Sequence, residues 1–249
     1  MRTNRINLLR STVLCAGSLA MMLRALLYAT AIDQKGLLIT GHWATWIILI
    51  LTGLILASLF LTTRKLQGPT DYAHCFPRSF LQGAISILVA CVFLQRSLAL
   101  YTIAGDRLHL IAILSGFLAA LALLIVGICR MLSKKPFFLC HCIISIFFAL
   151  QLINQYRRWS ADPQLMDYCF YLIALICLMF TAYFLAGFDV NMSSHKGLIF
   201  FSLAATYFCC LALPESGDTP LLIFGALWAY TCAPRIQPAP SEEALHENP

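Results

Sequence analysis

Long apolar runs separated by short polar segments dominate the chain. Most runs have the ~20 residues that an α-helix needs to cross the ~30 Å hydrocarbon core of a bilayer. The predicted spans cover residues 11–32, 36–62, 79–103, 108–132, 136–156, 164–188, 196–213 and 219–233. We therefore predict an all-α fold: a polytopic bundle of transmembrane helices with eight spans, or alternatively seven.

The last run leaves the number of spans open, because a helix over residues 219–233 would be only about 22 Å long. It crosses a bilayer only where the bilayer thins or flanking residues help. Pro214 and Gly217 interrupt the chain before it, and Pro234 ends it. We expect residues 1–233 to form a single transmembrane helical domain. Residues 234–249, rich in Pro, Glu and Ala, are expected to form a disordered C-terminal tail.

Composition supports a membrane protein. Hydrophobic residues make up 60% of the chain and charged residues 11%, whereas a soluble domain carries about 25% charged residues. The net charge of +6 comes from short basic clusters between apolar runs, with no long basic patch of the kind that binds nucleic acid. Membrane lipids are therefore the expected partners, with a membrane-protein partner or an oligomer as a further possibility, and nucleic acid is not.

The distribution of basic residues predicts the orientation. With the N-terminus in the cytoplasm, eleven lysines and arginines lie in inner segments and four in outer ones. Arg24 and Arg96, which lie within spans, complete the seventeen. Because cytoplasmic loops carry the excess of Lys and Arg, we predict a multi-pass protein of the cytoplasmic (cell) membrane with its N-terminus in the cytoplasm.

Catalytic and cofactor motifs are not found in the sequence. It contains no H-E-x-x-H, no P-loop, no G-x-S-x-G and no G-x-G-x-x-G. The eleven cysteines lie mostly inside apolar runs, where cysteine behaves as a small hydrophobic residue. Cys140-His141-Cys142 lacks the ligand spacing of a zinc site. We expect no metal and no cofactor, and an enzyme is disfavoured, though the sequence leaves it open through one pairing, Asp167 with His42.

Small residues recur at helical spacing in two spans. Ala112, Gly116 and Ala120 follow one another every four residues in the fourth span, and Gly225 and Ala229 repeat the spacing in the last. Such stripes let a second helix approach closely. We interpret both as contacts inside the bundle, with a dimer face as the alternative.

Polar residues inside the spans gather toward one leaflet. A charged side chain at the centre of a span costs about 2.5–3.5 kcal/mol, so such residues need partners or water. In the predicted topology Arg24 and Arg96 lie toward the outer leaflet. The fifth span ends with polar residues on one helix face, at the spacing i, i+3, i+4 and i+7: Gln151, Asn154, Gln155 and Arg158. The candidate ligand-binding residues are Arg24, His42, Arg96, Gln151, Asn154, Gln155, Arg158 and Asp167.

Two interpretations of this convergence remain. In the structural one, Arg96 pairs with Asp167, the amides bridge helices, and His42 is an ordinary interfacial histidine. In the functional one, the residues line an outward-facing polar cavity for an anionic small molecule or lipid, because Asp167 is the only carboxylate that we place at this depth beside two arginines. Binding or transport is our first hypothesis. An accessory subunit of a membrane complex comes second and an intramembrane enzyme third.

The sixth span carries a resemblance. The segment Asp162-Pro163-Gln164-Leu165-Met166-Asp167-Tyr168-Cys169-Phe170, running into Leu185-Ala186-Gly187-Phe188-Asp189, resembles uncharacterised multi-pass membrane proteins of anaerobic Gram-positive bacteria. The resemblance covers this span and its flanks. It implies a bacterial cytoplasmic membrane and no particular activity, so it assigns no role to any residue.

Overall fold

The structure, a computed structural model, describes residues 2–31, 42–64, 75–76, 79–101, 107–159, 169–214 and 218–233. Its eight helices in this part of the chain are α1 (Arg2–Thr30), α2 (Trp43–Arg64), α4 (Phe80–Tyr101), α5 (Arg107–Met131), α6 (Phe138–Trp159), α7 (Cys169–Asp189), α8 (His195–Ala212) and α9 (Thr219–Cys232). Each predicted span corresponds to one helix, which confirms the all-α bundle. The proposed disordered tail lies outside the described residues.

Seven of the described helices (α1, α2 and α4 to α8) are long and apolar enough to cross a membrane. Large apolar side chains such as Trp46, Leu54 and Phe80 are exposed, as expected for surfaces that face lipid chains. The chain is therefore a helical membrane protein with seven or eight spans. Helix α9 has 14 residues, about 21 Å of helix, so its status as an eighth span stays a prediction.

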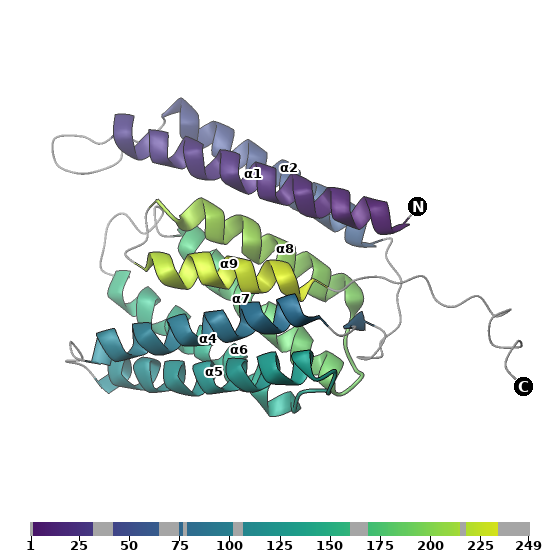
Figure 1. The fold of residues 1–249 in the computed structure, drawn as a ribbon. Helices are drawn as coiled ribbons and strands as arrows, with labels where there is room; N and C mark the ends of the chain where they lie inside the picture. The colour runs from purple at the N-terminus through teal and green to yellow at the C-terminus, as the bar shows by residue number, and fades with distance from the viewer. Residues whose placement is uncertain are drawn as a thin grey trace, which may run out of the picture.

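The helices alternate in direction and form two groups (Figure 1). Helix α4 packs against α5 and α9, α5 against α6, and α6 against α7, while α7 and α8 both contact α9. Helices α1 and α2 pair with each other and lie on α8. The main group is thus closed by a contact between α4 and α9, which lie far apart in the sequence.

Two names are used below for the ends of the bundle. The Arg96 end is the end where α1, α4, α6 and α8 finish and α5, α7 and α9 begin, at the left of Figure 1. The His141 end is the opposite end. If the predicted orientation is correct, the Arg96 end faces the outside of the cell.

Aromatic side chains fill the middle of the main group. Phe93 of α4 lies 5.3 Å from Phe147 and 6.2 Å from Phe148 of α6, measured between ring centroids. Phe148 in turn lies 6.1 Å from Trp228 of α9. All four side chains are buried. This aromatic layer joins α4, α6 and α9. Its one polar side-chain group is the indole N–H of Trp228.

The small residues pack helices inside the bundle, as we predicted. A Cβ atom on Gly116 of α5 would lie 2.3 Å from the Ser97 hydroxyl oxygen of α4. A Cβ on Gly83 of α4 would lie 2.8 Å from the carbonyl oxygen of Gly127 on α5, and one on Gly225 would lie 3.1 Å from Leu178 of α7. The backbones of α4 and α5 therefore approach too closely for larger side chains at these positions.

Candidate functional site

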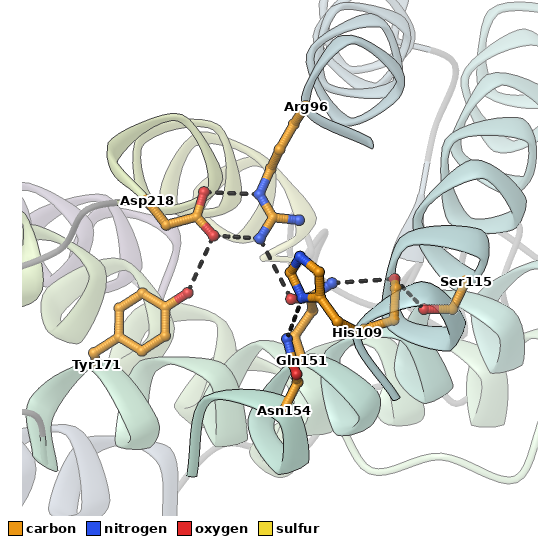
Figure 2. A network of polar contacts seen from close by, with 8 residues as sticks. Arg96, His109, Ser115, Gln151, Asn154, Tyr171 and Asp218 are labelled. Carbon is orange, nitrogen blue, oxygen red and sulfur yellow. Dashed lines mark hydrogen bonds and ion pairs between the residues drawn. The ribbon is translucent and has the colours of Figure 1, made fainter. Parts of the chain in front are cut away.

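A partly buried ion pair joins α4 to the residue before α9 at the Arg96 end (Figure 2). The Nε of Arg96 donates a hydrogen bond to Oδ1 of Asp218 at 2.7 Å, and Nη2 donates to Oδ2. The side chains are 8% and 17% exposed. The guanidinium thus holds both carboxylate oxygens at once, which is the strongest geometry for this type of pair.

The short length of α9 explains the position of Asp218. This residue directly precedes the helix, and its side chain makes no cap bond to it. A helix of about 21 Å cannot reach both surfaces of a ~30 Å apolar layer. Asp218 lies beside α4 with its side chain 17% exposed, and a largely buried carboxylate requires a charged or hydrogen-bonding partner. Arg96, which lies before the last turn of α4, provides it.

Neutral polar groups extend the ion pair into a network, drawn in Figure 2. The Gln151 Oε1 accepts a hydrogen bond from Arg96 Nη2 at 3.3 Å, and its Nε2 donates to the Ala112 carbonyl at 3.2 Å. The Tyr171 hydroxyl donates to Asp218 Oδ2 at 3.4 Å. Five helices, α4, α5, α6, α7 and α9, thus meet around one arginine and one carboxylate.

Gln155 completes the site from α6. Its side chain is 8% exposed and is hydrogen-bonded to Tyr171. Its Oε1 is buried and, among the described residues, has no hydrogen-bond donor. An unused buried acceptor is costly, so this oxygen is a position where a hydroxyl or amine from outside the chain would be stabilised.

The aromatic layer bounds the network on the side facing the centre of the bundle. Arg96 lies three residues after Phe93 on α4, and Gln151 lies four residues after Phe147 on α6. Residues at these spacings lie on the same helix face, one turn apart. The site is therefore a polar layer at one end of the bundle that rests on an apolar floor.

The structure brings some of the predicted site residues together and not others. Arg96, Gln151 and Gln155 belong to the network. Arg24 is buried at the same end, but its Cζ lies 4.5 Å from the Phe170 ring centroid and 5.8 Å from that of Tyr28. Asn154 hydrogen-bonds Nδ1 of His109 at 3.2 Å instead of Arg96.

Of the remaining predicted residues, the structure describes the side chain of His42 alone. The Nδ1 of His42 accepts a hydrogen bond from the backbone N–H of Ala44 at 3.3 Å, so this histidine caps α2. Asp167 and the side chain of Arg158 lie outside the described residues.

Asp218 is the main residue that sequence reasoning missed. We had expected Asp167 to be the one carboxylate at this depth, and that was wrong, because Asp218 holds Arg96. The signal was present in the sequence: a helix over 219–233 that runs inward must begin at the end where Arg96 lies. Hydropathy showed that this helix is short, but it did not show that the helix packs against α4 and brings Asp218 to Arg96.

The His141 end has its own buried polar groups. The Nδ1 of His141 on α6 lies 2.5 Å from Oδ2 of Asp189 on α7, and both side chains are fully buried. Sγ of Cys75 lies 3.0 Å from Nε2 of His195. Within the described residues no three His, Cys, Asp or Glu side chains converge as metal ligands do, and His141 of the Cys140-His141-Cys142 segment contacts Asp189.

Side chains from other helices cap the last carbonyls of α9 at this end. The Gln82 Nε2 donates to the Thr231 carbonyl at 2.7 Å, and Nη2 of Arg10 donates to the Ala233 carbonyl. Nη1 of Arg130 donates to Oε1 of Gln82 at 3.1 Å. A helix that ends inside an apolar layer needs such donors, because water is not there to supply them.

Comparison with known proteins finds no relative. No model of a protein family matches the chain, and no curated protein or solved structure does either. The resemblance of the sixth span therefore stays a prediction, and the function has to be inferred from the geometry of the bundle alone.

Proposed function

We propose that this helical membrane protein binds an anionic small molecule or lipid at Arg96, in exchange for Asp218. The observation that carries the proposal is the bidentate contact between the two residues. Carboxylate and phosphate groups bind arginine with the same pair of parallel hydrogen bonds. Asp218 thus occupies the position, and makes the bonds, that the anionic group of a ligand would take.

The two partners differ in how firmly the fold holds them. Arg96 lies within α4 and is packed between helices, whereas Asp218 lies in the turn before α9 and is the more exposed of the two. Release of Asp218 toward the membrane surface therefore requires less rearrangement than movement of Arg96. A ligand anion would replace the bonds that Arg96 loses, so the guanidinium stays compensated throughout the exchange.

Neighbouring groups favour a ligand that carries more than a negative charge. The Tyr171 hydroxyl can donate to the incoming anion as it donates to Asp218. The buried Gln155 Oε1 can accept from a hydroxyl or amine. Arg24 contacts Phe170, the residue before Tyr171, which adds a second positive charge near the same turn of α7 and favours anions further.

Two matched substitutions test the exchange. Arg96→Gln should abolish the thermal stabilisation that small carboxylates give to the detergent-purified protein. Asp218→Asn should increase it, because the internal competitor is removed. Arg157→Gln, which changes an exposed arginine on α6 at the same end, should leave it unchanged. Loss of stabilisation in Asp218→Asn would contradict the proposal and leave a purely structural ion pair.

Mass spectrometry of the purified protein identifies the ligand, and uptake into reconstituted vesicles distinguishes transport from binding. With the N-terminus in the cytoplasm, the ligand enters from the outside. A stoichiometric protein that copurifies with the chain would instead favour the accessory-subunit alternative.

A further inference from the structure

Arg130 is a buried arginine whose charge the described protein does not neutralise. It lies in the last turn of α5 and is 6% exposed. Its Cζ lies 4.7 Å from the ring centroid of Phe76, and its Nη1 donates to Gln82. Its Nε and Nη2 are buried and have no hydrogen-bond acceptor among the described residues.

The Nε and Nη2 atoms of Arg130 correspond to the two nitrogens with which Arg96 binds a carboxylate. In Arg96, Nε and Nη2 hold the two oxygens of Asp218. In Arg130 the same two atoms have no acceptor in the described part of the chain. The two carboxylates in the described part of the chain are engaged elsewhere, Asp189 with His141 and Asp218 with Arg96. A buried guanidinium without an anion is strongly unfavourable.

The depth of Arg130 indicates which anion is available. It lies one residue before the end of α5, and it contacts Gln82 near the start of α4. Both positions are at the ends of membrane spans, where the phosphate groups of lipids lie. The exposed Lys134 and Lys135 follow directly and add positive charge to the same interface.

We propose that the Nε–Nη2 fork of Arg130 binds a phosphate group, supplied either by the headgroup of an anionic lipid or by a free phosphate-bearing solute. Gln82 orients the guanidinium through Nη1, and the Phe76 ring covers one of its faces, so the fork is aimed before the phosphate arrives. This inference does not depend on the function proposed for Arg96, because the two arginines lie at opposite ends of the bundle.

The test compares Arg130→Gln and Arg130→Lys with Arg64→Gln. Arg64 is a matched control, because it also lies in the last turn of a helix at the His141 end but is exposed. The protein is purified in neutral detergent and examined by native mass spectrometry after exposure to vesicles of phosphatidylglycerol or of phosphatidylcholine. A second arm measures the thermal shift with inorganic phosphate in lipid-free detergent.

A lipid headgroup is supported if the unmodified protein and Arg64→Gln both retain phosphatidylglycerol. Arg130→Gln should then bind this lipid with an affinity roughly ten- to hundredfold lower. The same pattern with inorganic phosphate alone supports a free solute. If Arg130→Gln does not fold, Arg130→Lys decides, because it keeps the charge but lacks the fork and should still bind more weakly.

Three results would overturn the proposal: no lipid or phosphate bound by the unmodified protein, equal binding by all variants, or an equal loss in Arg64→Gln. It would also be overturned if replacing Glu242, Glu243 and Glu247 by Gln destabilised the protein as much as Arg130→Gln does, because the fork would then belong to the chain's own carboxylates. The variant Arg96→Gln should keep this phosphate site. A failure of the Arg130 proposal can therefore be distinguished from a failure of the function proposed for Arg96.

Discussion

The two ends of the bundle contain arginines in contrasting environments, and α9 connects them. At the Arg96 end the start of α9 carries Asp218, which fills the fork of Arg96. At the His141 end the last turn of α9 offers only neutral carbonyl oxygens, which Gln82 and Arg10 cap. Among the described residues, Gln82 links Arg130 to this end of α9 by hydrogen bonds. One arginine is thus compensated by a charge and the other by a single neutral acceptor and an aromatic ring.

Helix polarity accounts for much of this difference. The first N–H groups of a helix favour a nearby anion, and the last carbonyls favour donors. A helix too short to reach both surfaces therefore requires opposite partners at its two ends. Asp218 suits the start of α9 for this reason, and the arginine that binds it becomes neutralised. The last carbonyls of α9 do not require an anion, and within the described ranges no carboxylate binds Arg130.

The orientation of the two ends is an all-or-none property. A cysteine introduced at Asp106 or Asp162 should react with an impermeant thiol reagent added to intact cells, above the background of the unmodified chain. A cysteine introduced at Lys134 should react only after the membrane is opened. The physical reason is the excess of Lys and Arg in the segments at the His141 end. The reverse pattern would place the Arg96 site in the cytoplasm.

Removal of one partner of the ion pair should have the largest energetic effect. Arg96→Gln leaves Asp218 buried without its cation and should lower the free energy of unfolding by about 3 kcal/mol. The double variant with Asp218→Asn should recover part of this loss, because the remaining amides can bond to each other. Chemical denaturation in detergent measures both. A double variant as unstable as the sum of the two single variants would mean that the residues do not interact.

Overpacking between α4 and α5 should have an intermediate effect that also differs between the ends. Gly83→Ala places a Cβ 2.8 Å from a backbone carbonyl oxygen and should cost about 1–3 kcal/mol. Gly116→Ala meets the Ser97 hydroxyl, which can rotate away, so its cost should be lower. Gly53→Ala on α2, where no atom lies within 4 Å of the new Cβ, is the control and should be neutral or stabilising. Thermal unfolding ranks the three.

Arg130→Gln should have the smallest effect when neither lipid nor phosphate is present. Without an anion the substitution removes an uncompensated charge, which stabilises the fold, and the bond to Gln82, which destabilises it, so the free energy of unfolding should rise or should fall by less than about 1 kcal/mol. Unfolding in phosphate-free neutral detergent after removal of lipid measures it. A loss as large as that of Arg96→Gln under these conditions would mean that the chain itself neutralises Arg130, and the contrast between the ends would disappear.

Hydropathy by itself determined the helices of this protein. The length of an apolar run is local information, and the bilayer converts it directly into a span. The same is true of Gln151 and Gln155, whose spacing alone places them on one helix face. Both face the bundle interior, where they are buried. The small-residue stripes likewise predicted close helix contacts that the structure confirms at Gly116 and Gly225.

Only the tertiary structure decided which residues meet. Arg96 and Asp218 are 122 positions apart, and His141 and Asp189 are 48 apart. Their contacts depend on the rotation of each helix and on which helices are neighbours, such as α4 and α9, and neither follows from hydropathy. The position of Asp218 also depends on the packing of α9 against α4, α7 and α8. The periodicity of one helix predicts which of its faces is polar. Which residues contact that face depends on the packing of the whole bundle.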